Sequence, residues 1–317
     1  MSEPTGPRTI AIIGASGRQG GAQVRQAVAA GFNVRALSRS IDPFYGATQP
    51  ENVEVVAADL YDEASLMRAF EGADAVFHTH PLRARQDRAV LVGSVGRAAK
   101  AAGVKRVVWN TSSWIPDRPG DPYTYAGNTA GINELWRSGV GGTVFGSVLF
   151  MDNLLTNWAR PSIVNDSKFV YAHRPDLWAN WISLDDVARI MIHSLDRPDM
   201  EEAWMNIGGP ERLQPGDVAK ALSGALGRTI EYAPCTPAEF GKRLAYAYGD
   251  EMGPEERAAI ATSIGAFYEY NNNAPTRPFE VDTEAMLERL PIELETVATW
   301  AKRQDWSNSN APRPPAG

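Results

Sequence analysis

A glycine pattern near the start of the chain suggests a phosphate site. Gly14 to Gly20 reads GASGRQG, a G-x-x-G-x-x-G spacing that follows the short apolar segment 9–13 and runs into a helical segment. Glycines in this context allow a tight turn, close approach of the backbone to a pyrophosphate, and close helix–strand packing, while the helix start holds the anion. The alternative is an ordinary glycine-rich turn. The residues expected to contact a dinucleotide here are Gly14, Ser16, Gly17, Arg18, Gln19 and Gly20.

The end of the second apolar segment bears on which dinucleotide is bound. An NAD site usually has an acidic residue there for the ribose 2′-hydroxyl, whereas this chain has Ser38 and Arg39. A guanidinium can pair with a 2′-phosphate through two hydrogen bonds, and Arg18 could stack on the adenine or reach the same phosphate. We therefore expect NADP(H) as the preferred cofactor, with NAD(H) as the alternative. Two solvated arginines would be the non-functional explanation.

Two further segments with polar side chains follow expected strands. Asp59 and Leu60 come after the third strand, where Asp59 could accept a hydrogen bond from the adenine amine or instead cap the next helix. His78, Thr79 and His80 end the fourth strand, and the two histidines share a strand face. We expect Thr79 and His80 beside the cofactor, with His80 as an acid/base candidate or else a packed histidine. No third ligand is evident nearby, so no metal site is expected.

The elements that must position these residues alternate between strands and helices. Apolar strand-like segments occur at 9–13, 33–37, 53–57, 75–77 and 104–109. Helical segments between and after them occupy 22–30, 63–70, 87–102 and, beyond a Pro/Gly loop at 115–121, 131–137. This alternation is typical of βαβ units. It predicts an α/β fold with a Rossmann-type doubly wound parallel sheet.

After a sixth strand at 143–150 the pattern becomes mixed, with shorter strands and more helices. We expect a smaller mixed or helical C-terminal substrate region. The expected organisation is an NAD(P)-binding Rossmann domain over 1–150, to which parts of 165–210 return, a substrate-binding region over 151–306 and a disordered tail over 307–317.

Composition limits the classes of function. The formal net charge of −7 argues against a nucleic-acid surface, which needs an excess of basic residues. A single cysteine rules out an intrachain disulfide and suits a reducing compartment. No apolar run is long enough to span a membrane, and no signal peptide is evident, so we expect a cytoplasmic protein. The sequence does not distinguish a monomer from a homodimer.

Several longer segments carry a family resemblance. The chain contains GASGRQGGAQV, ALSR, ADLYDEASLMRAFEGADAVF, VKRVVWNTSS, VLFMDNLL, WISLDDVARIMIHSL and NIGGPERLQPGDVAKALSGALGRTIEY. Together they resemble the NmrA-like branch of the atypical short-chain dehydrogenase/reductase superfamily. The resemblance implies a Rossmann domain with a small C-terminal substrate domain. Members include NAD(P)H-dependent reductases of quinones and of phenolic or isoflavone-like molecules, and also redox-sensing regulators that bind dinucleotide without turnover.

The chain departs from the superfamily's catalytic pattern. Classical short-chain dehydrogenases use Tyr-x-x-x-Lys and a serine after the fifth strand, and the lysine lowers the tyrosine pKa. Here Asn110 and Ser113 follow that strand, Tyr125 comes next, and no lysine occurs between 106 and 167. Asn128 stands where many relatives have the lysine. Tyr125 could donate a proton, position a substrate or simply pack. The catalytic candidates are Tyr125, His80, Ser113 and Asn128, and Asn110 is a candidate cofactor contact.

Aromatic residues gather on the side of the chain expected to bind substrate. The candidate substrate contacts are Trp114, Phe150, Met151, Asn153 and Trp181. Aromatic walls suit a flat, apolar ligand, although core packing is the alternative for each residue. The leading hypothesis is an NADP(H)-dependent oxidoreductase acting on a small aromatic, quinone-like or carbonyl compound. A non-catalytic NAD(P)(H) sensor acting through a protein partner is the alternative, and the missing Tyr-x-x-x-Lys pair disfavours a third, a nucleotide-sugar epimerase.

Overall fold

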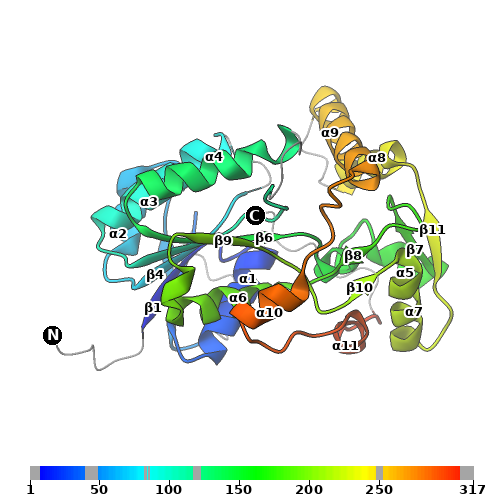
Figure 1. Cartoon of the computed structure of the whole chain (residues 1–317), viewed down its shortest axis with the longest axis horizontal. Helices are drawn as coiled ribbons and strands as arrows, with labels where there is room; N and C mark the ends of the chain where they lie inside the picture. Colours follow the sequence, from blue (N-terminus) through cyan, green and yellow to red (C-terminus); the bar gives the residue numbers. More distant parts are fainter. Residues whose placement is uncertain are drawn as a thin grey trace.

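A seven-stranded parallel sheet forms the centre of the molecule (Figure 1). The structure is a computed structural model that describes residues 8–39, 49–81, 84, 86–116, 123–247 and 253–307, with the backbone alone at 123 and 124. The strand order is β3-β2-β1-β4-β5-β6-β9. The strands are β1 (Thr9–Ile13), β2 (Asn33–Ser38), β3 (Val53–Ala57), β4 (Ala75–Thr79), β5 (Arg106–Asn110), β6 (Gly141–Ser147) and β9 (Ala203–Ile207).

Helices cover both faces of this sheet. Figure 1 shows α2 (Glu63–Phe70), α3 (Arg88–Ala101) and α4 (Tyr123–Arg137) on one face. On the other face lie α1 (Arg18–Ala29), α6 (Leu184–His193) and α10 (Thr283–Arg289). Two apolar cores, one per face, hold these layers, because strands buried on both sides carry mostly Val, Ile and Ala. The expected Rossmann-type α/β fold is confirmed.

Two helices begin earlier than the sequence pattern indicates. The helix expected at 22–30 starts at Arg18, inside the glycine pattern, and the helix expected at 131–137 starts at Tyr123. The second difference matters for the site, because it places Tyr125 and Asn128 on the first two turns of α4. Most of the loop expected at 115–121 and of the tail expected at 307–317 lies outside the described residues.

The C-terminal part of the chain packs beside the carboxyl edge of the sheet, at the right of Figure 1. Two small sheets pair β7 (Lys168–Tyr171) with β11 (Glu231–Pro234) and β8 (Ala179–Asn180) with β10 (Arg212–Leu213). The helices of this part are η2 (Met151–Leu155), α5 (Arg160–Asp166), α7 (Pro215–Leu226), α8 (Pro237–Ala247), α9 (Pro254–Asn273) and α11 (Val297–Lys302). Two short turns, η3 (Ser194–Asp196) and η4 (Pro198–Met200), connect α6 to β9. Within the described ranges, every helix is too short or too polar to be a membrane span.

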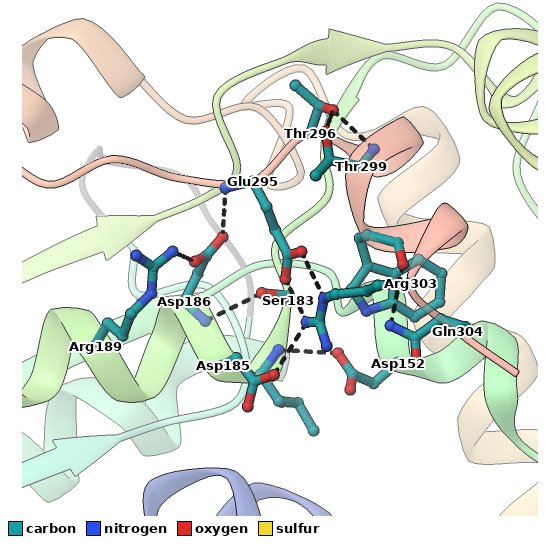
Figure 2. A network of polar contacts seen from close by, with 12 residues as sticks. Asp152, Ser183, Asp185, Asp186, Arg189, Glu295, Thr296, Thr299, Arg303 and Gln304 are labelled. Carbon is teal, nitrogen blue, oxygen red and sulfur yellow. Dashed lines mark hydrogen bonds and ion pairs between the residues drawn. The ribbon is translucent and has the colours of Figure 1, made fainter. Parts of the chain in front are cut away.

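A polar network at the start of α6 joins the two parts (Figure 2). The Asp152 carboxylate of η2 accepts a hydrogen bond of 2.9 Å from the Leu184 amide. The Asp185 carboxylate lies between two arginines, 2.8 Å from Arg25 of α1 and 3.0 Å from Arg303, just after α11. These contacts hold segments far apart in sequence against one helix, so η2 is fixed beside the start of α6.

Candidate functional site

The strand order reverses between β1 and β4, which continue into opposite halves of the sheet. In open α/β sheets ligands bind outside the carboxyl ends of the strands at this kind of switch point. The register pairs Ile12 with Phe77 and Thr79 with Asn110, so the loops after β1, β4 and β5 emerge side by side. These three loops carry most of the residues singled out from the sequence.

The loop after β1 has the geometry that the glycine pattern predicts. Gly14 has a φ of +68°, in the left-handed region that favours glycine. The Gly17 amide donates a hydrogen bond of 2.9 Å to the Gly14 carbonyl, which closes the turn. A Cβ on Gly20 would lie only 2.1 Å from that carbonyl oxygen, so α1 packs closely on the loop only because glycine is there.

The start of α1 is open to an anion. Its N-cap is Gly17, which has no side chain to bond the first amides, and its first turn has no acidic residue. The first amides of a helix lack intrahelical partners and carry partial positive charge. Ser16, half-buried in the same loop, adds a hydroxyl beside them. This arrangement fits a pyrophosphate.

Arg39 and Asp59 lie at the neighbouring strand ends. Ser38 pairs with Ala57 in the sheet, so the segments after β2 and β3 run together. Arg39 is exposed, and among the described residues no hydrogen bond or ion pair is recorded for it. The Asp59 carboxylate accepts a hydrogen bond of 3.0 Å from the amide two residues on, while Asp62 caps α2, so the capping alternative for Asp59 is wrong. Leu60 packs against the sheet core.

Arg18 and Gln19 bond to segments outside the loop after β1. The Arg18 guanidinium donates a hydrogen bond of 3.1 Å to the Asp152 carbonyl of η2, which links the phosphate loop to the C-terminal part. The Gln19 amide donates to the Ser112 hydroxyl at 2.9 Å and accepts from Asn110 at 2.7 Å. A contact of Arg18 with the adenine or the 2′-phosphate stays a prediction.

The loop after β5 is held by the buried amide of Asn110. Its oxygen accepts the Ser112 amide at 3.1 Å and also the Ser147 hydroxyl of β6. Ser112 has a φ of +58°, which is uncommon for a residue other than glycine and is found at functional sites. Thr79 of β4 accepts a hydrogen bond of 3.2 Å from Gln23 of α1. The hydrogen bonds to Asn110 position Ser113 at the carboxyl end of β5.

Ser113 and Asn128 come together as expected, and a residue missed by the sequence analysis joins them. The Asn128 amide donates to the Ser113 hydroxyl at 3.0 Å and to the Trp114 carbonyl at 2.7 Å. Arg88, the first residue of α3, donates to the Asn128 oxygen and, at 3.5 Å, to the Ser113 hydroxyl. A positive charge, absent at position 128 itself, is thus provided next to Asn128 by α3. No sequence spacing could have revealed this, because Arg88 and Asn128 are 40 residues apart.

The two histidines at the end of β4, His78 within the strand and His80 just after it, are neutral at physiological pH. Burial, with smaller effects from His80 and Arg88, lowers the pKa of His78 to about 3. Burial and the Arg88 charge lower the pKa of His80 to about 4. Their rings lie 6.5 Å apart, on the same side of the strand. At neutral pH His80 can hydrogen-bond a ligand, but it holds no imidazolium proton to donate.

Tyr125 is placed as a packing residue. Its side chain is 1% exposed, and its hydroxyl donates a hydrogen bond of 2.6 Å to the buried Asn271 of α9. Its ring packs edge-on against Trp114 with centroids 5.3 Å apart. These contacts join α4 to the C-terminal part. The catalytic role expected for Tyr125 is untested, and this geometry favours the packing alternative.

The candidate substrate contacts divide by exposure. Trp114, Met151 and Trp181 are at most 2% exposed and belong to the C-terminal aromatic core. Phe150 and Asn153 are only partly buried, at the junction of β6 and η2, and remain better placed to meet a ligand. Among the described residues, no three His, Cys, Asp or Glu side chains gather in a way that could hold a metal ion.

Comparisons with known proteins bear on this arrangement. Among curated proteins, the NAD(P)H azoreductase of Xenophilus azovorans is 29% identical over 230 residues, 72% of this chain and 77% of that protein. Among solved structures, NmrA, a negative transcriptional regulator in complex with NAD, aligns with a TM-score of 0.73 and 19% identity over 95% of this chain and 99% of that chain. An NADPH-dependent quinone oxidoreductase from Escherichia coli, complexed with NADPH, aligns with a TM-score of 0.71 and 19% identity over 92% and 98%.

At these identities the two structures establish a shared fold only. The family model gives the stronger result, because it matches residues 7–301, from before β1 to the end of α11. The resemblance inferred from the sequence segments is confirmed. The chain belongs to the NmrA-like family.

Proposed function

We propose that this chain is an NADP(H)-dependent oxidoreductase that reduces a small aromatic, quinone-like or carbonyl compound. The observation that carries the proposal is the loop after β1, where a left-handed Gly14, a Gly20 with no room for a side chain and an uncapped helix start form a pyrophosphate cradle. The exposed Arg39 at the next strand end supports the 2′-phosphate of NADP(H) over NAD(H).

The bound cofactor would supply the hydride, and the chain's own residues would bind and orient the reactants. Gly14, Gly17 and Gly20 shape the loop, and the first amides of α1 hold the pyrophosphate. The loop after β5 places the Ser113 hydroxyl at the sheet edge, beside Asn128. With Tyr125 bonded to Asn271, positioning rather than acid/base catalysis is the chain's main contribution.

A redox-sensing protein without turnover is the second candidate. The observation that favours it is the buried Tyr125 hydroxyl, together with the absence of lysine from 106–167. The NAD-bound NmrA structure is described as a transcriptional regulator, which supports the same alternative. In either case we propose that the protein is cytoplasmic. We also propose that it binds no nucleic acid directly, because its formal net charge is −7.

A turnover assay separates the two candidates. The protein is incubated with NADPH and a panel of quinones, azo compounds and aromatic aldehydes, and absorbance of the reduced nicotinamide is followed. Oxidation of NADPH that requires an acceptor supports the oxidoreductase. Tight NADPH binding with no acceptor-dependent oxidation across the panel supports the sensor instead.

A further inference from the structure

The inference concerns Arg88, an arginine for which the described residues provide no acidic partner. Its recorded hydrogen bonds both leave from one nitrogen, Nη1, and end on neutral groups, the Asn128 amide oxygen and the Ser113 hydroxyl. Among the described residues, no ion pair with a carboxylate and no bond from Nε or Nη2 is recorded for it. By contrast, Arg97 on the same helix pairs with Glu63 at 2.7 Å in the ordinary way.

No described acidic side chain compensates the charge of Arg88. Burial lowers the pKa of the guanidinium, and no acidic group is among the causes of that change. The nearest titratable side chains on β4, His78 and His80, are themselves neutral at physiological pH. A partly buried cation without a counter-ion is costly to keep. Such a cost is usual where a ligand provides the opposite charge.

The position of Arg88 points to the acceptor rather than to the cofactor phosphates. The phosphate cradle lies after β1, whereas Arg88, Ser113 and Asn128 meet beyond β4 and β5, two strands further along the sheet. The same loop leads directly into Trp114, where the aromatic core of the C-terminal part begins. A ligand held there would lie at the carboxyl ends of β4 and β5, beside the segment that leads into this core.

We propose that Arg88, held by Asn128 and Ser113, recognises an acidic group on the acceptor, so that the enzyme prefers flat aromatic acceptors bearing a carboxylate, sulfonate or phosphate. The N–H groups on Nε and Nη2 of the guanidinium suit the paired oxygens of such groups, which accept two parallel hydrogen bonds. This inference rests on the proposed function for the identity of the reaction, but not for the binding of the acidic ligand.

The test uses a matched pair of acceptors, 1,4-naphthoquinone-2-sulfonate and the neutral 2-methyl-1,4-naphthoquinone. Arg88→Gln should raise the KM for the sulfonate by about 10- to 100-fold and change the KM for the neutral quinone by less than about 3-fold. Comparing variant with wild type for each quinone cancels their different intrinsic reactivity. Arg88→Lys, which keeps the charge but cannot donate two parallel hydrogen bonds, should retain only part of the preference, and Arg97→Gln should leave both values unchanged.

Three results would overturn the inference. The first is an equal rise in KM for both quinones in Arg88→Gln, and the second is no change in KM for either. The third is weaker NADPH binding by Arg88→Gln, which would place Arg88 at the cofactor. If the wild type reduces neither quinone, binding of the sulfonate in the presence of NADP⁺ is measured by tryptophan fluorescence. Binding that Arg88→Gln abolishes then supports the anion site while the proposed oxidoreductase activity fails, and absence of binding rejects the site.

Discussion

At the residue scale, we propose that cofactor choice depends on the exposed side chain of Arg39. Arg39 has no recorded partner among the described residues and stands where an NAD-specific protein has a carboxylate. We expect Arg39→Gln to weaken NADPH binding by about 10- to 100-fold, because charge-assisted hydrogen bonds to the 2′-phosphate are lost. NADH, which has no such phosphate, serves as the internal control. Parallel fluorescence titrations check this, and equal weakening of both cofactors would reject the assignment.

The role of Tyr125 can be settled in the same way. Tyr125→Phe removes the hydroxyl bonded to the buried Asn271, so we expect a stability loss of about 1–3 kcal/mol with kcat nearly unchanged. Tyr246→Phe is the matched control, because that side chain is 68% exposed and both properties should stay constant. Urea unfolding and turnover are measured on the same samples. A 100-fold fall in kcat without destabilisation would instead make Tyr125 catalytic.

At the element scale, the turn between β1 and α1 is the feature on which cofactor binding depends. A Cβ on Gly20 would lie 2.1 Å from the Gly14 carbonyl oxygen, whereas one on Gly21 meets nothing closer than 3.8 Å. We therefore expect Gly20→Ala to shift α1 away from the loop, because the added methyl group overpacks the contact at a cost of about 1–3 kcal/mol. NADPH binding should then be weaker by about 10- to 100-fold. Calorimetric titration measures the effect.

Gly21→Ala is the control for this substitution. It adds the same methyl group one residue later, and in a helix interior alanine stabilises by about 0.5–1 kcal/mol relative to glycine. We expect unchanged affinity and a slightly higher Tm. Similar behaviour of the two variants would mean that the close contact at Gly20 is not what forms the cradle.

The order of elements could be read from the sequence, but the start of α4 could not. Strands and the β1–α1 turn have strong local patterns, so the fold and the phosphate loop were predictable. The pattern predicted only 131–137 of α4, because Gly127 in the first half of the helix is a poor helix former. Gly131 is required by tertiary packing, since a Cβ there would lie 2.5 Å from the Trp109 ring. Local propensity cannot report a contact of that kind.

The same limit applies to the candidate site. The glycines and Arg39 were predicted from their places at strand ends, whereas Ser113 was predicted from the superfamily pattern of a serine after the fifth strand. Arg88 was missed because its link to Asn128 arises from the packing of α3 against α4. The burial of Trp114 and Trp181 was equally hidden, because an aromatic residue reads the same in sequence whether it lines a site or fills a core.

At the scale of the whole molecule, buried histidines make stability depend on pH. His78 and His173 are nearly inaccessible, and burial is the main cause that lowers the pKa of each to about 3. In the unfolded chain a histidine pKa is ~6.5, so below that pH protons bind the unfolded state preferentially. The contribution of each buried histidine to stability is therefore present above this pH and is lost as the pH falls. When the pH falls from 7 to 5, each of the two histidines should lower the free energy of unfolding by about 2 kcal/mol.

A variant isolates this effect from other groups. His173 packs among aromatic rings, with Tyr171 and Phe279 centroids 4.6 Å and 5.1 Å away, so phenylalanine can replace it. We expect the drop in unfolding free energy between pH 7 and 5 to be about 2 kcal/mol smaller in His173→Phe. Asp152 and Asp186, whose pKa values burial raises, act in the opposite direction but equally in both proteins. Equal drops, measured by urea unfolding, would contradict the histidine account.

The central claim is that the turn after β1 holds the pyrophosphate of a nicotinamide dinucleotide. Titration of the purified protein with NADPH and with NADH tests it most directly. We expect one site per chain, with NADPH bound more tightly than NADH. Failure to bind either dinucleotide would contradict it.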